Sequence, residues 1–153
     1  PIRPPAIAGR RIVQVVATAR VRSSHQTFRP GAIAIAALTA DAAAVTLANR
    51  GDARAIVALT RGGSTARQLS ALRPRAPIFA VTSSETTARR LALYRGVVPI
   101  ALDPSDVAAA RGSRAGQPLV ERGHVAGGDV AVFININPDL ALADSNYLRI
   151  QRL

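Results

Sequence analysis

The pattern of apolar and polar positions between residues 54 and 96 predicts two consecutive β–α units. Residues 55–59 and 77–81 are uninterrupted apolar runs, and each is followed by a threonine and a polar segment that can open a helix. An apolar run of this length, bounded by turn residues, is typical of a strand buried on both faces. Two such units in succession predict parallel strands joined by right-handed helical crossovers.

Further elements are expected on both sides of this pair. Residues 31–49 are rich in alanine, with larger apolar residues at intervals, which favours a helix that ends at a glycine cap. Residues 97–102 and 130–136 are further apolar runs, and we expect a strand in each. The helical stretch that opens at residue 103 is interrupted by glycines and a proline, so we expect it to be short or broken. Residues 146–153 alternate between polar and apolar side chains, as an edge strand does.

The turn after the first apolar run is the strongest candidate for a binding site. This 60–65 loop consists of Thr60, Arg61, Gly62, Gly63, Ser64 and Thr65. Adjacent glycines let the backbone fold tightly with its N–H groups on one side, and the following helix adds unpaired N–H groups and the positive end of its dipole. With the hydroxyls and the guanidinium, these donors fit an anion, best a phosphate. The loop alone is equally consistent with a capped turn that binds nothing.

The composition excludes several chemistries. The 153 residues contain no cysteine, which excludes disulfides, thiolate catalysis and cysteine-based zinc sites. His25 and His124 are the only histidines, and neither has neighbours at metal-ligand spacing. No apolar run reaches the length of a membrane span. Because neither a Ser/His/Asp arrangement nor a lysine-containing phosphate loop is present, we expect no catalytic residue, no metal site and no cofactor.

The chain is strongly basic, and its charge is unevenly distributed. All 20 cationic residues are arginine, against nine acidic residues, which gives a formal net charge of +11. Such a charge favours anionic partners: phosphates, nucleic acid or acidic protein surfaces. Residues 1–29 contain arginines and prolines but no acid, so we expect a basic N-terminal arm there. An arginine-rich, acid-free start is also typical of organellar targeting sequences, which leaves both the cytoplasm and the mitochondrial matrix open.

Three stretches of the chain resemble one protein family. They read AIVALTRGGSTAR from residue 55, RPRAPIFAVT from residue 73 and TARRLALYRGVVPI from residue 87. A strand, a Thr-x-Ser-Gly-x-Ser/Thr loop, a second strand with Ala-Pro-Ile and a helix that ends in Tyr-x-Gly-Val-x-Pro form the pattern of the C-terminal domain of pyruvate kinase, its allosteric effector domain. The chain therefore resembles this domain without the catalytic barrel. Gly62 stands where most members have serine.

The resemblance implies a fold and a site. The fold would be a three-layer α/β/α sandwich over residues 30–153, with a mostly parallel five-stranded sheet and an antiparallel C-terminal edge strand. The 60–65 loop would hold the phosphate of an effector, and the loop between the last two strands would close over it. That second loop has no glycine and carries two carboxylates, which would oppose a bound phosphate. The polar residues of this effector lid are Asn137, Asp139, Asp144 and Ser145.

Three hypotheses for the function stay open. The first is a non-catalytic effector domain that binds a phosphorylated metabolite, mediates subunit assembly, or does both. The second is a structural accessory subunit of a large assembly, mitochondrial or ribonucleoprotein, whose basic arm contacts its neighbours. The third is a contact between the arginines of the arm and an RNA backbone, without base stacking. Family members pair through their last strand, so the resemblance implies a homodimer through that strand, or a larger hetero-assembly that covers it.

Overall fold

The structure is a computed structural model that describes residues 30–109, 116–136 and 147–153. The basic arm expected over residues 1–29 lies outside the described residues. The elements follow the chain in this order: α1 (Pro30–Arg50), β1 (Ala55–Leu59), α2 (Ser64–Ala71), β2 (Ile78–Thr82), α3 (Glu85–Leu91), β3 (Val97–Ala101), α4 (Pro104–Ala109), α5 (Gln117–Glu121), β4 (Val130–Asn135) and β5 (Tyr147–Arg152).

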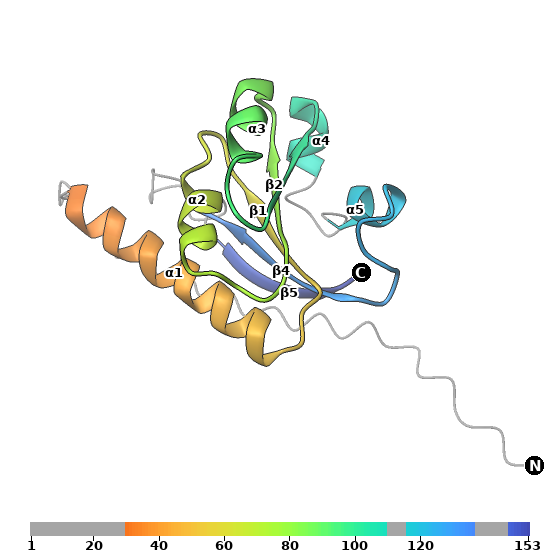
Figure 1. Cartoon of the computed structure of the whole chain (residues 1–153), viewed down its shortest axis with the longest axis horizontal. Helices are drawn as coiled ribbons and strands as arrows, with labels where there is room; N and C mark the ends of the chain where they lie inside the picture. Colours follow the sequence, from red (N-terminus) through yellow and green to blue (C-terminus); the bar gives the residue numbers. More distant parts are fainter. Residues whose placement is uncertain (1–29, 110–115, 137–146) are drawn as a thin grey trace, which may run out of the picture.

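The five strands form one sheet in the order β3-β2-β1-β4-β5 (Figure 1). The strands β1 to β4 are parallel to one another, and β5 pairs with β4 in the antiparallel direction. In the centre of the sheet, Val57 pairs with Phe79 on one side and with Phe133 on the other. The predicted fold, a mostly parallel sheet with an antiparallel C-terminal edge strand, is therefore confirmed.

Two apolar clusters cover the two faces of this sheet. Ile56, Val132 and other residues on one face pack against α1, α2 and α3 through side chains such as Leu69. Val57 and its neighbours on the other face pack with Leu119 of α5 and with α4. Every residue of β1 is buried, because helices cover both sides of this central strand. The predicted three-layer arrangement is confirmed.

The core is built mainly from small and aliphatic side chains. Ala44 and Ala48 of α1 and Ala66 of α2 are at most 2% exposed, and they let these helices approach the sheet closely. Phe79 and Phe133 are the large aromatic members of the core. No helix among the described residues is both long and apolar enough to cross a membrane.

One expected boundary differs from the structure. The family pattern places Tyr94 at the end of its helix, whereas α3 ends at Leu91, and residues 92–94 continue as a tight turn in which the N–H of Tyr94 donates to the carbonyl of Leu91 at 3.1 Å. A turn of this i−3 type is a common end of an α-helix. The helical stretch after residue 103 consists of two short helices, α4 and α5, as its glycines and proline predicted.

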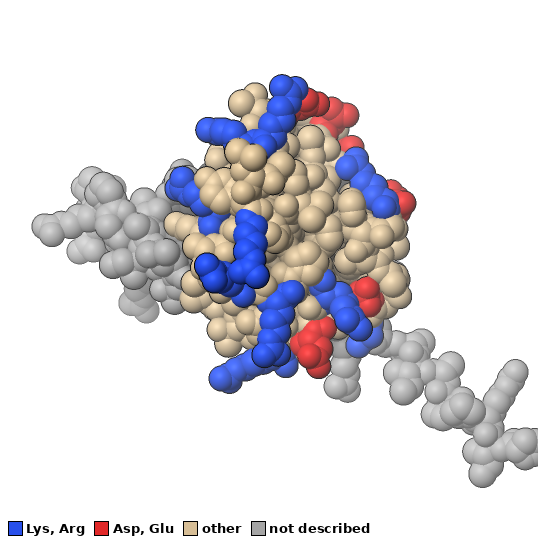
Figure 2. Space-filling model, viewed as in Figure 1, with Lys and Arg blue, Asp and Glu red and all other residues tan. Residues whose placement is uncertain are grey.

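Among the described residues, the segment that contains α2 and α3 is basic and the segment that contains α4 and α5 is mainly acidic. Residues 61–96, which include α2 and α3, contain seven arginines and a single acid, Glu85. In Figure 2, which has the same view as Figure 1, arginines lie over the α2 region. On the opposite layer, the described residues between β3 and β4 carry four acids and one arginine, namely Asp103, Asp106, Glu121, Asp129 and Arg122.

Candidate functional site

The 60–65 loop lies where the strand order of the sheet reverses. The chain passes from β1 to β2 on one side of β1, whereas β4 lies on its other side. The crossover helices α2 and α3 pack on one face, and α4 and α5 pack on the other. In open α/β sheets, such a switch point leaves a crevice at the carboxyl ends of the strands, where ligands bind. The 60–65 loop follows the carboxyl end of β1, so it occupies this position.

One hydrogen bond closes the loop. The N–H of Gly63 donates to Oγ1 of Thr60 at 2.9 Å. The N–H of Thr60 continues the β1 ladder by donating to the carbonyl of Val81 at 2.9 Å. Gly63 has a φ of +87°, in the left-handed region that favours glycine, and it is the N-cap residue of α2. A Cβ added to Gly63 would lie 3.1 Å from Cδ2 of Leu91, so α3 also limits this position.

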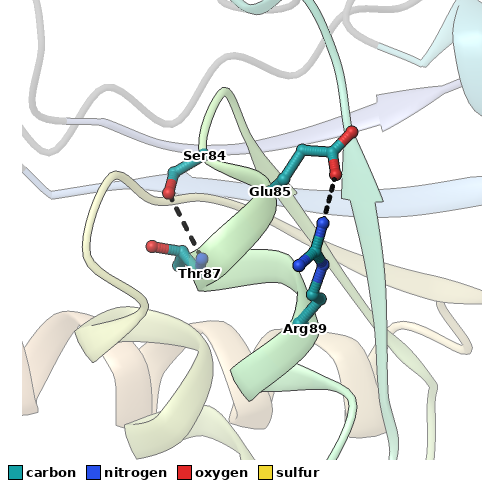
Figure 3. A network of polar contacts seen from close by, with 4 residues as sticks. All are labelled: Ser84, Glu85, Thr87 and Arg89. Atoms are coloured by element: carbon teal, nitrogen blue, oxygen red, sulfur yellow. Dashed lines mark hydrogen bonds and ion pairs between the residues drawn. The ribbon is translucent and has the colours of Figure 1, made fainter.

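Two threonines from the neighbouring β–α unit donate hydrogen bonds to the main chain of the loop. The hydroxyls of Thr82 and Thr87 both donate to the carbonyl of Arg61, at 3.5 Å and 3.2 Å. Thr82 is 1% exposed and Thr87 is 4% exposed. The N–H of Thr87 in turn donates to Oγ of Ser84, which caps α3 (Figure 3). These contacts fix the main chain of Arg61, whose side chain is exposed.

The first turn of α2 offers main-chain donors. Within the described part of the chain, the N–H groups of Ser64, Thr65 and Ala66 have no hydrogen-bond acceptor. No side chain caps this end of the helix, and no acid lies in its first turn. Unpaired N–H groups together with the positive end of the helix dipole favour a bound anion.

The six predicted residues of the loop are not equally accessible. Arg61, Gly62 and Ser64 are exposed, and Thr60 is half-buried. Thr65 is only 5% exposed, so its main-chain N–H rather than its hydroxyl is the better candidate donor. Nothing lies within 4 Å of a Cβ added to Gly62, which leaves space above the loop. The structure places the predicted loop at the carboxyl end of β1 and distinguishes its exposed residues from its buried ones, while its role in binding stays a prediction.

The predicted effector lid lies outside the described residues. Its candidate residues Asn137, Asp139, Asp144 and Ser145 follow Asn135, the last residue of β4, and precede β5. Their roles stay predictions.

The described residues contain no metal centre: no group of three or more His, Cys, Asp or Glu side chains among them could hold a metal ion. His124 is exposed, and its ring centroid lies 5.2 Å from that of Phe79 with the two ring planes tilted by 44°, so it packs against the core.

A buried carboxyl group lies on α1, apart from the loop in sequence. Asp41 is 1% exposed, and neither of its carboxyl oxygens has a hydrogen-bond partner. Burial raises the pKa of Asp41 to about 7, because a charged carboxylate is poorly solvated inside the protein. Sequence reasoning did not identify this residue, although its spacing from the buried residues Ala44, Val45 and Ala48 places all four on one helix face.

The sequence profile described as "Pyruvate kinase, alpha/beta domain" matches residues 39–151 of the chain. The chain belongs to the pyruvate kinase alpha/beta domain family. The crystal structure of a pyruvate kinase from Cryptosporidium parvum is similar, with a TM-score of 0.62 and 24% sequence identity. The similarity covers 82% of this chain but 26% of that pyruvate kinase, so the chain spans about a quarter of its length. No curated protein sequence matches the chain.

Membership of the pyruvate kinase alpha/beta domain family confirms the resemblance found in the sequence. The match is to this domain only, and the catalytic barrel is not part of it. Reasoning from sequence named the 60–65 loop but missed Thr82 and Thr87, which position it. A threonine directly after an apolar strand was visible for both β1 and β2, and only the fold shows that the second one supports the loop after the first.

Proposed function

We propose that this chain is a non-catalytic pyruvate kinase alpha/beta domain that binds the phosphate group of a metabolite at the 60–65 loop. The observation that carries the proposal is the set of unpaired N–H groups at Ser64, Thr65 and Ala66, beside the exposed side chain of Arg61. These groups lie at the switch point of the sheet, where ligands of open α/β folds bind.

Each residue of the loop has a proposed role. The N–H groups of Ser64 and Thr65 bind phosphate oxygens, and the guanidinium of Arg61 adds a charge-assisted hydrogen bond. Gly62 leaves the space in which the phosphate lies. Thr60 and Gly63 keep the turn closed, which holds the N–H groups in place before the ligand arrives.

The proposal includes no chemical step. The family match is confined to the alpha/beta domain, which fits a chain that is not an enzyme on its own. The described residues offer a binding loop without a neighbouring histidine or carboxylate that would act as acid or base. A phosphorylated ligand is therefore expected to leave the protein unchanged.

Gly62 gives a sharp test of the phosphate site. An aspartate at this position would place a carboxylate beside the bound anion, whereas an asparagine has nearly the same size and no charge, and neither meets another atom within 4 Å of its Cβ. We would measure binding of inorganic phosphate, sugar phosphates and sugar bisphosphates by calorimetry at physiological salt. Gly62→Asp should weaken binding by about tenfold or more, and Gly62→Asn should weaken it much less.

A second pair of variants tests the charge of the loop. Arg61→Ser removes an exposed guanidinium from the loop, and Arg122→Ser removes one from the C-cap of α5 on the other layer. If the phosphate binds at the loop, only the first substitution lowers the affinity. Equal losses in both variants, or binding that disappears at physiological salt, would show non-specific attraction to a basic protein instead.

Subunit assembly is the second candidate function, and one observation favours it. β5 is the last strand of the sheet and pairs with β4 alone among the described strands. A strand at the edge of a sheet can pair with another chain. Analytical ultracentrifugation, with hydrogen exchange of the β5 amides, tests this. A dimer formed through β5 should slow the exchange of β5 amides as the protein concentration rises, and a monomer at every concentration would exclude it.

A further inference from the structure

Three exposed apolar side chains lie at the carboxyl ends of α2 and α3. Leu72, Leu93 and Tyr94 are 45%, 87% and 37% exposed, and they are the exposed large apolar residues among those the structure describes. Leu72 is the C-cap residue of α2, and the other two follow the last turn of α3. Single exposed leucines are ordinary, but three that gather at one end of a domain indicate an interaction surface.

Hydrogen bonds hold these two helix ends side by side. The hydroxyl of Ser70, in the last turn of α2, donates to the carbonyl of Arg95 at 2.8 Å. The turn after α3 is also tied to the sheet, because the N–H of Ile78 donates to the carbonyl of Gly96 at 2.8 Å. The surface formed by Leu72, Leu93 and Tyr94 is therefore supported by ordered main chain on both sides.

Exposed arginines lie next to this apolar group in the sequence. Arg73 follows Leu72 directly, Arg90 lies in the last turn of α3, and Arg95 follows Tyr94, and all three are exposed. The single acid of residues 61–96, Glu85, is already paired with Arg89 at 3.0 Å (Figure 3). The three arginines thus face no acid from α2 or α3. We call the group of Leu72, Leu93, Tyr94, Arg73, Arg90 and Arg95 the α2–α3 end surface.

From this arrangement we infer that the α2–α3 end surface is a docking site for a partner protein whose acidic residues surround an apolar centre. Protein interfaces have an apolar centre and a polar rim, and both tyrosine and arginine are common among the residues that dominate their affinity. A second copy of this chain would present the same arginines and a net charge of +11, so like charges oppose it. A nucleic acid would pair with the arginines but would leave the 87% exposed side chain of Leu93 without an apolar partner.

The chemistry of the partner can be measured without knowing its identity. The full chain is immobilised and used to select binders from a display library of random 12-residue peptides at physiological salt, with the Leu93→Ser/Arg95→Ser variant used for counter-selection. The surviving peptides are expected to be rich in Asp and Glu together with Leu, Ile or Phe. Synthetic copies of them should bind the Leu93→Ser and Arg95→Ser variants about tenfold more weakly than the parent chain.

Matched controls separate this surface from general basic charge. Arg89→Ser/Arg122→Ser removes two arginines outside the α2–α3 end surface and should leave peptide binding within about twofold of the parent. Leu93 is so exposed that its replacement by serine should not disturb the fold, and circular dichroism of the variant checks this. The proposal would be overturned if the selection gave no peptides whose binding is weakened by the Leu93→Ser and Arg95→Ser substitutions.

A labelled single-stranded RNA of about 20 nucleotides, measured by fluorescence anisotropy, is the competing probe. RNA binding that depends on Arg90 and Arg95 but not on Leu93, together with failure of the peptide selection, would overturn the proposal in favour of a nucleic-acid surface. Weak RNA binding that is lost at physiological salt and is equally sensitive to Arg89→Ser/Arg122→Ser supports the protein partner, because it identifies the RNA contact as general attraction to charge.

Discussion

The N–H of Gly63 donates to the hydroxyl oxygen of Thr60 at 2.9 Å, and this contact joins the end of β1 to the start of α2. α2 begins at Ser64, directly after this turn, so its first N–H groups lie near the switch point of the sheet. This hydrogen bond orders the loop, and under the proposed function an ordered loop favours phosphate binding because less conformational entropy is lost when the ligand binds.

The two adjacent glycines of the loop should respond differently to alanine. Gly63 has a φ of +87°, and its added Cβ would lie 3.1 Å from Cδ2 of Leu91. Gly63→Ala should therefore lower the free energy of unfolding by about 1–3 kcal/mol. Gly62 has no atom near its added Cβ, so Gly62→Ala should change stability by less than about 1 kcal/mol. Urea unfolding followed by circular dichroism measures both, and equal effects would contradict the assigned roles.

The buried threonine behind the loop should matter for stability and for ligand affinity. Thr87 donates to the carbonyl of Arg61 at 3.2 Å and is 4% exposed, so Thr87→Val should cost about 1 kcal/mol of unfolding free energy. Because the carbonyl is then held less firmly, phosphate binding should weaken as well. Thr86 is exposed on the same helix, and Thr86→Val is the matched control that should leave both quantities nearly unchanged. The two variants are compared by thermal unfolding and by calorimetry with inorganic phosphate.

A strained backbone position should be improved by glycine. Arg73 has a φ of +50°, in the left-handed region that is costly for residues other than glycine. Arg73→Gly should therefore raise the free energy of unfolding by up to about 1 kcal/mol, since relief of this strain exceeds the added freedom of the unfolded chain. Arg75 lies two residues further on without a positive φ, so Arg75→Gly should be neutral or destabilising. Denaturant unfolding that ranks the two variants in the opposite order would show that the Arg73 side chain stabilises the helix end.

The strands could be predicted because each buried strand corresponds to an apolar run in the sequence. Residues 55–59 form β1 with the predicted bounds, since a strand covered on both faces needs an unbroken apolar run. The end of α3 was predicted too late, because residues 92–94 are compatible with a helix and only the tertiary contact from Ser70 to the carbonyl of Arg95 shows where the chain turns. The 60–65 loop was selected as a candidate site from the chemistry of its residues, and its binding role stays a prediction.

The support of that loop could not be predicted from the sequence. Thr82 and Thr87 lie 21 and 26 residues from Arg61, and their contact depends on the parallel pairing of β1 with β2 and on the position of α3. The burial of a lone acid in an alanine-rich helix is also hard to predict, because alanines lie on every face of that helix and do not show which face is buried. Asp41 would ordinarily be assigned to the solvent side, and only the packing of α1 against β1, β4 and α2 makes it a buried group.

Asp41 should make the protein less stable as the pH rises toward neutrality. Its pKa is raised to about 7 in the folded protein, above its value in the unfolded chain, so folding is accompanied by proton uptake between these two pKa values. The contribution of Asp41 to stability is then most favourable below about pH 4 and is lost as the pH rises through about 7. Since each pKa unit corresponds to about 1.4 kcal/mol, the full change is of the order of 4 kcal/mol.

The measurement is the difference in unfolding free energy between the parent chain and Asp41→Asn, from urea titrations at several pH values between 4 and 8.5. Asparagine cannot ionise, so subtracting the two curves removes the contribution of the other carboxyl groups. The unfolding free energy of Asp41→Asn relative to that of the parent should increase as the pH rises from about 4 to about 7. At pH 8 the variant should be the more stable protein. A difference that does not change with pH would mean that Asp41 has a cationic or hydrogen-bonding partner in solution, and its buried oxygens would then not be unpaired as the structure has them.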